Sequence, residues 1–166
     1  MKYDLLNILL VDDNRHMRAL LTAILRAIGV KNIFEASDGA EALQALRSHD
    51  FDLIMTDLQM EPLDGIDFVR LLRNSPDSPC PMVPVIMITG HSTMRRVAEA
   101  RDVGVTEFLS KPVTARGVLQ RIGLVIDHPR AFVRTEGYFG PDRRRRRDPA
   151  YAGPHRRASD KTARTI

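Results

Sequence analysis

Acid, hydroxyl and amine side chains follow four short apolar runs of the sequence, each at the point where a run ends. They are Asp12 with Asp13, Asp57, Thr89 and Lys111. A parallel strand that is covered on both faces reads as a continuous apolar run. Because the carboxyl ends of parallel strands lie at the same edge of a sheet, we expect these five side chains to lie close together.

These groups suit the transfer of a phosphoryl group to a carboxylate. Asp57 can act as a nucleophile that forms an aspartyl phosphate, and Asp12 with Asp13 adds oxygen ligands for a hard cation such as Mg²⁺. Three neighbouring carboxylates repel one another, whereas a divalent cation and the Lys111 ammonium offset their charge. Thr89 would then donate a hydrogen bond to one phosphoryl oxygen while Lys111 pairs with another.

Each of these residues also has a simpler interpretation. Asp12 and Asp13 suit the N-cap of the following helix, a role that Asn14 can also fill. Asp57 alone suits a turn, and Lys111 alone suits a solvated surface. Their joint placement after four separate strands favours the phosphoacceptor site over these alternatives.

The elements that must position the site alternate between strand and helix along the chain. Apolar runs predict strands near residues 6–11, 32–36, 53–57, 83–88 and 106–109. Apolar residues at helical spacing, bounded by Gly, Pro and capping residues, predict helices within residues 14–28, 65–74, 92–104 and 114–126. The segment 37–41, with an acid three residues after Asp38, predicts the start of a further helix. Five repeats of strand and helix predict a parallel sheet with helices on both faces.

The same residues resemble the receiver domain of two-component response regulators. The resemblance covers roughly residues 5–126 and rests on Asp12-Asp13, Asp57, Thr89-Gly90 and the segment Phe108-Leu109-Ser110-Lys111-Pro112. It implies an α/β, flavodoxin-like (βα)5 fold of three layers, whose five-stranded parallel sheet has the order 2-1-3-4-5.

The resemblance also implies the role of each site residue. Asp57 would accept a phosphoryl group from the phosphohistidine of a histidine kinase or phosphotransfer protein. The chain would not be an enzyme with a separate substrate, but would assist its own phosphorylation and dephosphorylation and signal to a downstream protein. The implied Mg²⁺ ligands are Asp12, Asp13, Asp57 and the backbone carbonyl of Gln59.

Three further expectations come from the same resemblance. Thr89 and Phe108 would form a switch pair in which the hydroxyl moves toward the phosphate and the ring turns inward. Gln59 and His91 occupy positions where side chains of the family affect water access to the phosphate. The Lys111-Pro112 peptide bond is expected to be cis, so that the amine is aimed at the site.

Composition indicates a cytoplasmic protein. The 166-residue chain is 43% apolar, has the single cysteine Cys80, and contains no run that approaches the roughly 18 apolar residues of a membrane span. One cysteine excludes an intramolecular disulfide and suits a reducing compartment.

Charge divides the chain into two regions. Residues 1–126, the expected receiver domain, hold 14 Lys and Arg against 16 Asp and Glu, whereas residues 127–166 hold 11 against 5. The second region repeats the unit Tyr-x-Gly-Pro-x-Arg-Arg at residues 138–144 and 151–157. Because Pro and Gly oppose a helix, we expect this basic extension to be extended or disordered.

The sequence of the basic extension is compatible with several functions. It can be a solubilising tail, a docking segment for an acidic protein, or a segment that binds nucleic acid or an anionic membrane. In the nucleic-acid case the chain would be a transcriptional regulator, which is the alternative to a stand-alone receiver. The candidate partner-binding residues are Arg143, Arg144, Arg145, Arg146, Arg147, Arg156 and Arg157.

Overall fold

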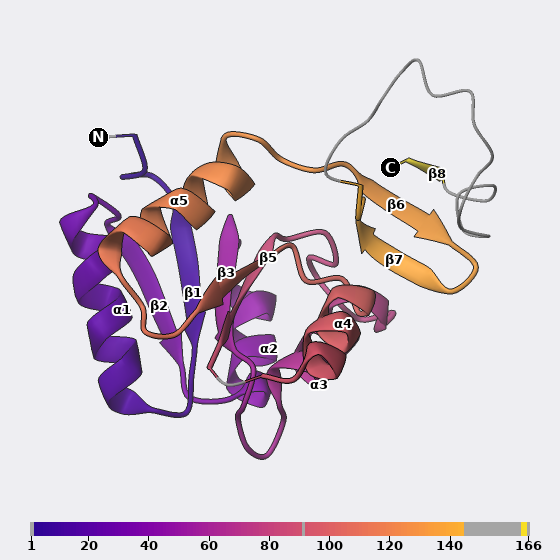
Figure 1. The fold of residues 1–166 in the computed structure, drawn as a ribbon, viewed down its shortest axis with the longest axis horizontal. Helices are drawn as coiled ribbons and strands as arrows, with labels where there is room; N and C mark the ends of the chain where they lie inside the picture. The colour runs from indigo at the N-terminus through magenta and orange to yellow at the C-terminus, as the bar shows by residue number, and fades with distance from the viewer. Residues whose placement is uncertain (1, 91, 145–163, 166) are drawn as a thin grey trace.

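The computed structural model describes residues 2–90, 92–144 and 164–165. Its main body is a five-stranded parallel sheet, of order β2-β1-β3-β4-β5, with helices on both faces (Figure 1). The strands are β1 (Asn7–Val11), β2 (Asn32–Ala36), β3 (Leu53–Asp57), β4 (Val85–Thr89) and β5 (Glu107–Ser110). The helices are α1 (Arg15–Ala27), α2 (Gly39–Ser48), α3 (Gly65–Asn74), α4 (Met94–Asp102) and α5 (Ala115–Ile126). The predicted fold class and strand order are confirmed.

The strand register brings the chemically active residues to one edge of the sheet. Every residue of β3 and β4 is buried, which explains why the sequence of both strands is almost continuously apolar. Val11 pairs with Thr56 and Asp57 with Ile88, so β1, β3 and β4 end at the same level. The residues that follow these strands therefore lie side by side.

Each helix of the main body begins at a polar side chain that accepts a backbone N–H. The caps are Asn14, Asp38, Asp64, Thr93 and Thr114. Asn14 caps α1 through bonds from the amides of His16 and Met17, so neither Asp12 nor Asp13 is used as the cap. Within the described residues, no helix is long and apolar enough to cross a membrane.

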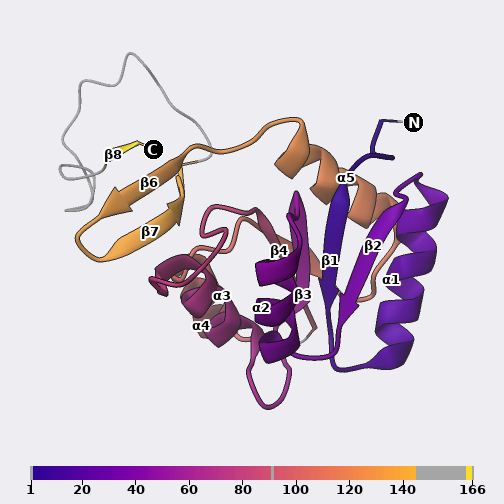
Figure 2. The same ribbon diagram turned by 180° about the vertical axis from the view of Figure 1, so that it is seen from behind.

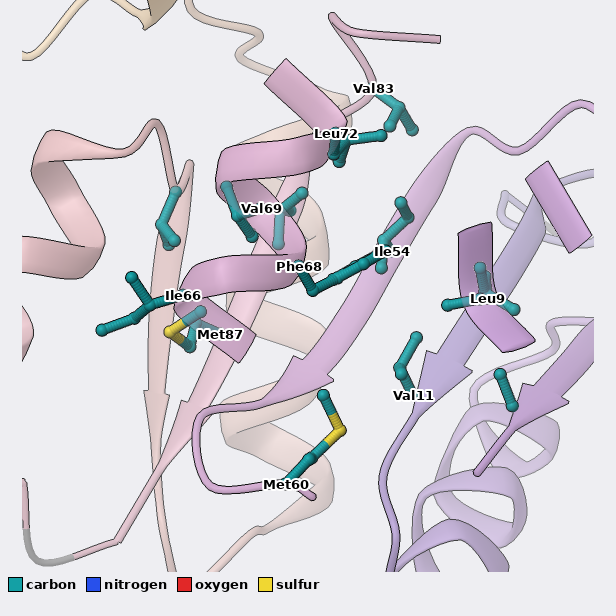
Figure 3. Packing of buried hydrophobic residues seen from close by; sticks show 14 of the residues in the cluster. Leu9, Val11, Ile54, Met60, Ile66, Phe68, Val69, Leu72, Val83 and Met87 are labelled. Atoms are coloured by element: carbon teal, nitrogen blue, oxygen red, sulfur yellow. The ribbon is translucent and has the colours of Figure 1, made fainter. Parts of the chain in front are cut away.

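Alternate residues of the strands build a separate hydrophobic core on each face of the sheet. On one face, strand residues such as Leu9 and Ile54 pack with α2 and α3, where Phe68 is completely buried (Figure 3). On the other face, Leu10 and Met55 pack with α1 and α5. The three layers predicted from the alternation of strands and helices follow from these two cores.

The beginning of the basic extension is a folded hairpin. Strands β6 (Phe132–Thr135) and β7 (Tyr138–Pro141) pair antiparallel, and β8 (Arg164–Thr165) adds to the other side of β6. Phe132, Val133 and Phe139 are buried. Residues 138–141 of the first Tyr-x-Gly-Pro-x-Arg-Arg unit thus form β7, while the second unit, residues 151–157, lies outside the described residues.

Candidate functional site

Three carboxylates meet where β1 and β3 end. Asp57 is the last residue of β3 and is 5% exposed, Asp12 follows β1 and is 2% exposed, and Asp13 is exposed. The three residues can offer oxygen atoms that all lie within 4.8 Å of one another. The structure therefore brings together the three acidic residues that the sequence singled out.

Lys111 reaches this acidic group from the end of β5. Its Nζ lies 3.0 Å from Oδ1 of Asp57, and its backbone amide donates to the carbonyl of Thr89 at 2.7 Å. The Lys111-Pro112 bond is cis, as predicted. A second cis bond, Glu61-Pro62, lies in the loop after Asp57 and was not predicted.

The two residues expected to form the switch pair lie on neighbouring strands. Thr89 ends β4, is 6% exposed and pairs with Ser110, while Phe108 pairs with Met87. The Phe108 ring is partly buried and packs against the core on the α2–α3 face. Gln59 is exposed in the loop two residues after Asp57, and its carbonyl remains a predicted ligand.

Burial perturbs the acidity of the two inner carboxylates. Burial raises the pKa of Asp12, and the charge of Asp57 adds to the rise while the amide of Asn14 opposes it. Burial also raises the pKa of Asp57, although the hydrogen bond and charge of Lys111 oppose this. A positive charge close to Asp12 and Asp57 would therefore lower the pKa of both groups and favour their ionised forms.

The donor set fits a divalent cation of the magnesium type. Oδ1 of Asp12 accepts the amide of Asn14 at 2.8 Å, but its buried Oδ2 has no hydrogen-bond partner among the described residues. Such an oxygen is costly unless something pairs with it. Together with the oxygens of Asp13 and Asp57, it forms the all-oxygen ligand set that hard cations prefer.

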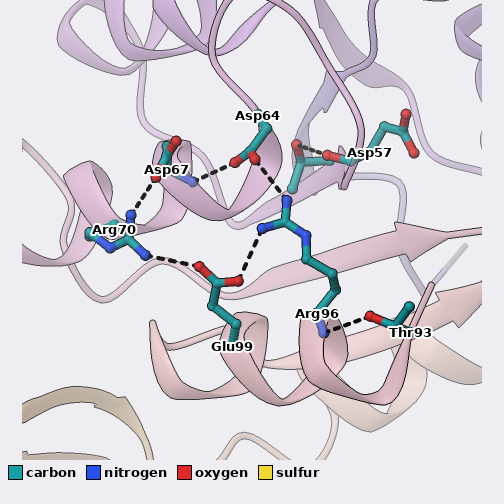
Figure 4. Close-up of polar contacts among 8 residues, drawn as sticks. Asp57, Asp64, Asp67, Arg70, Thr93, Arg96 and Glu99 are labelled. Carbon is teal, nitrogen blue, oxygen red and sulfur yellow. Dashed lines mark hydrogen bonds and ion pairs between the residues drawn. The ribbon is translucent and has the colours of Figure 1, made fainter.

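An ion-pair network beside the site was not found from the sequence. Arg96 of α4 pairs with Asp64, the cap of α3, at 2.7 Å and with Glu99 at 3.0 Å (Figure 4). Arg70 extends the network from α3 to Glu99 at 3.4 Å and also contacts Asp67. Spacing of three residues within a helix suggests the pairs inside α3 and α4, but no sequence pattern indicates the contact between the two helices.

Two of the arginines predicted to bind a partner contact acids outside the acidic group. Arg143 pairs with Asp102 at 2.7 Å, and Arg144 lies 3.5 Å from Asp142. The other five, Arg145, Arg146, Arg147, Arg156 and Arg157, lie outside the described residues, as does His91.

Two relatives of this chain carry names from bacterial chemotaxis. The chain is 34% identical over 122 residues to the chemotaxis protein CheY-3 of Vibrio cholerae, covering 74% of this chain and 92% of that protein. It is 35% identical over 122 residues to the chemotaxis protein CheY of Pseudomonas aeruginosa, covering 74% and 97%.

Solved structures match the same region. Chemotaxis protein CheY4 of Vibrio cholerae matches with a TM-score of 0.67 and 29% identity, over 72% of this chain and 98% of that chain. The receiver domain of a sensor histidine kinase from Pseudomonas aeruginosa, which holds a magnesium ion in its active-site cleft, matches with a TM-score of 0.62 and 28% identity over 72% and 94%.

The hairpin lies outside the region that the family model matches. The family model described as the response regulator receiver domain matches residues 8–123, which end before β6 begins at Phe132. The matched residues include Asp12, Asp13, Asp57 and Lys111. The chain belongs to the response regulator receiver domain family.

Proposed function

We propose that the chain is a phosphorelay switch in which Asp57 accepts a phosphoryl group from a phosphohistidine. The observation that carries this proposal is the 3.0 Å contact between the Lys111 ammonium and the Asp57 carboxylate, within a group of three carboxylates. An amine and acids arranged in this way can position a phosphoryl group and balance its charge.

In the proposed reaction an oxygen of Asp57 forms a bond to phosphorus. The bond between phosphorus and the donor's imidazole nitrogen breaks, and its electron pair stays on that nitrogen, which takes up a proton. Lys111 pairs with a phosphoryl oxygen, and the Thr89 hydroxyl donates to another. The chain is then a phosphoacceptor that assists its own phosphorylation and dephosphorylation, not an enzyme that acts on a separate substrate.

Mg²⁺ is the cofactor that we propose for this site. Asp12, Asp13, Asp57 and the carbonyl of Gln59 would hold it. The ion would supply positive charge that offsets the carboxylates and the phosphoryl oxygens. The unpartnered Oδ2 of Asp12 supports this assignment.

The proposed partners are a histidine kinase or phosphotransfer protein upstream and a protein target downstream, in the cytoplasm. The single cysteine of the sequence is free in the structure and suits a reducing compartment. The alternative, direct binding of nucleic acid by the arginines, stays a prediction. Two of those residues, Arg143 and Arg144, contact acids of the chain itself.

Incubation with a small phosphodonor and Mg²⁺ tests the proposal. We expect intact-protein mass spectrometry to show the mass of one added phosphate, which is lost after chelation of the metal. Asp57→Asn keeps the shape of the side chain and should abolish the addition. Asp50→Asn, at an exposed aspartate before the other end of β3, is the matched control and should be labelled normally. Undiminished labelling of Asp57→Asn would reject the assignment.

A further inference from the structure

The hairpin, defined here as residues 130–144, packs on the end of the sheet opposite the acidic site. It contacts Arg73 near the end of α3, Asp102 at the end of α4 and Glu107 at the start of β5, whereas Asp57 and Thr89 are the last residues of their strands. Both ribbon views place β6 and β7 beyond the ends of α3 and α4 (Figures 1 and 2). We call the surface beneath the hairpin, formed by Arg73, Asp102, Gly104 and Glu107, the α4–β5 corner.

At the centre of this contact the two backbones meet directly. Gly104 has a φ of +105°, and a Cβ at this residue would lie 3.1 Å from the carbonyl oxygen of Phe139. A Cβ at Gly140 would lie 2.9 Å from Cα of Gly104 and 2.6 Å from the Tyr138 hydroxyl. A Cβ atom closer than 3.0 Å to another heavy atom forces that atom or the backbone to shift. The hairpin can therefore pack this closely against Gly104 only because residue 140 has no side chain.

Two charge contacts fasten the sides of the hairpin. Arg143 pairs with Asp102, the last residue of α4, and its guanidinium lies 4.6 Å from the centre of the Tyr138 ring. Arg130 lies 3.6 Å from Glu107, the first residue of β5. The hairpin is therefore tied to both elements of the corner.

The buried guanidinium of Arg73 limits the free energy that the receiver gains when the hairpin packs against it. Arg73 is 2% exposed, donates to the carbonyls of Gly104 and Pro81, and lies 4.9 Å from the centre of the Phe132 ring. Burial lowers its pKa to about 10, and its Nη2 has no hydrogen-bond partner among the described residues. Burying an unpaired donor opposes the gain from the aromatic rings, so lifting the hairpin would let water reach this group. The contact is thus suited to opening and closing.

The α4–β5 corner is linked to the acidic site by the same two elements. Helix α4 starts next to Thr93, four residues after Thr89, and ends at Asp102. Strand β5 starts at Glu107, and the next residue is Phe108. A movement of either element as a unit would therefore change its contacts with the hairpin.

We propose that the hairpin is a reversible clamp on the α4–β5 corner that opposes phosphorylation of Asp57, a proposal that rests on the function proposed above. With the clamp closed, Lys111 is paired directly with the Asp57 carboxylate, and a phosphoryl group must displace that ammonium. Contacts that hold α4 and β5 in this arrangement stabilise the unphosphorylated conformation relative to the phosphorylated conformation. By reciprocity, phosphorylation loosens the clamp.

Two glycines of the same hairpin provide a matched test in the full chain. Gly140→Ala adds a methyl group where there is no room, whereas Gly137→Ala adds one where no atom lies within 4 Å. In hydrogen exchange, we expect the β6 and β7 amides of Gly140→Ala to exchange at least about tenfold faster than those of Gly137→Ala. Arg143→Gln, which removes the charge and adds no bulk, should act in the same direction by a smaller factor.

The coupling is measured with beryllofluoride and Mg²⁺, a phosphoryl analogue. We expect Gly140→Ala to bind it with a Kd about fivefold lower than Gly137→Ala or the unaltered chain, in the usual range of coupling between sites. Equal Kd values, with the hairpin opened in Gly140→Ala, would overturn the clamp. Equal exchange rates of the two variants in β6 and β7 would overturn the docking itself.

Failure of the proposed function gives a different result. If the unaltered chain binds no beryllofluoride, the phosphoacceptor assignment fails. The clamp is then judged by exchange of the amides at residues 87–89 and 109–110 without ligand. Faster exchange there in Gly140→Ala than in Gly137→Ala supports coupling between the corner and that edge, and equal exchange overturns it.

Discussion

Nζ of Lys111 lies 3.0 Å from Oδ1 of Asp57, so the amine that follows β5 neutralises part of the charge at the end of β3. The ammonium and the burial of Asp57 act on its pKa in opposite directions, because burial raises it and Lys111 lowers it. Lys111 therefore counteracts the effect of burial and favours the ionised form of Asp57, which is the form that can act as a nucleophile.

Replacing Lys111 should slow phosphorylation strongly. We expect Lys111→Met to reduce the rate of labelling by a small phosphodonor by about 100-fold, the usual loss when one donor to a developing charge is removed. The control is Lys31→Met, which removes an amine that pairs with Asp4 on the exposed surface. A labelling rate of Lys111→Met within a few-fold of the control would contradict the role of the ammonium.

Neutralising Asp12 should stabilise the metal-free protein. Asp12→Asn keeps an oxygen for the amide of Asn14 but removes a buried charge whose Oδ2 has no partner among the described residues. We expect a gain of about 1 kcal/mol, or roughly 2–4 °C in Tm for a chain of this size, measured by thermal unfolding in chelator. Asp13→Asn, at an exposed aspartate, should give a smaller gain.

That gain should depend on pH and on Mg²⁺. The pKa of Asp12 is raised above 3.8 in the folded protein, so the folded state binds its proton more readily than the unfolded state. The advantage of Asp12→Asn is then full at neutral pH, shrinks as the pH falls through the raised pKa, and is absent below about 3.8. Saturating Mg²⁺ should reverse the order at neutral pH, because it stabilises only the chain that binds it. A gain unchanged from pH 7 to pH 3 would contradict this account.

The ion pair between Asp64 and Arg96 should contribute stability with the opposite pH dependence. Partial burial would raise the pKa of Asp64, but the amide of Asp67 and the guanidinium of Arg96 outweigh it, so the pKa is lowered. Its contribution is therefore present above the ordinary value of 3.8 and lost as the pH falls through the lowered pKa. We expect Asp64→Asn, which still caps α3, to cost about 0.5 kcal/mol, and Asp64→Ala about 1 kcal/mol more.

A double-mutant cycle separates these two roles of Asp64. Arg96→Gln should remove the same ion-pair contribution, so combining it with Asp64→Asn should add almost nothing further. Additive losses in urea unfolding at pH 7 would show that the two side chains do not interact in solution.

The residue after which the chain is truncated should decide whether the receiver keeps its full stability. Ending the chain after Ile126 removes the hairpin from Arg73 and the rest of the α4–β5 corner, and we expect a loss of about 1–2 kcal/mol in the free energy of unfolding. Ending it after Arg144 should leave the stability within about 0.5 kcal/mol of the full chain. Equal stabilities of the two truncations would contradict the packing of the hairpin. The second truncation is also the correct reference for any binding of polyanions by residues 145–166.

The sheet and the acidic site were predictable because their signals are local. Each central strand is an apolar run that ends on the residue of interest, and Asp57 needs no distant information to be placed at the end of β3. The carboxylates come together because parallel strands end at one edge. The Lys111-Pro112 cis bond followed from family resemblance, whereas nothing local marked Glu61-Pro62.

The hairpin was not predicted, because its apolar residues are few and lie in a basic region. The buried rings of Phe132 and Phe139 pack against each other, and Phe132 also lies over Arg73 of the receiver, so they do not need a core of their own. The available signal was Glu136-Gly137, a two-residue turn with glycine between two short β-prone segments. The burial of Arg73 depends on contacts with residues far along the chain, which no periodicity shows.

The meeting of Gly104 and Gly140 offers a way to sort related chains by sequence. Glycine after the end of a helix is common in any receiver, so Gly104 alone is uninformative. In a chain with a basic tail, a larger residue at position 140 has no room for this backbone contact, and one at position 104 would be strained by the φ of +105°. The pair of glycines, one before strand five and one in a Tyr-x-Gly-Pro segment after helix five, therefore distinguishes receivers able to seat such a hairpin from those that merely carry a charged tail.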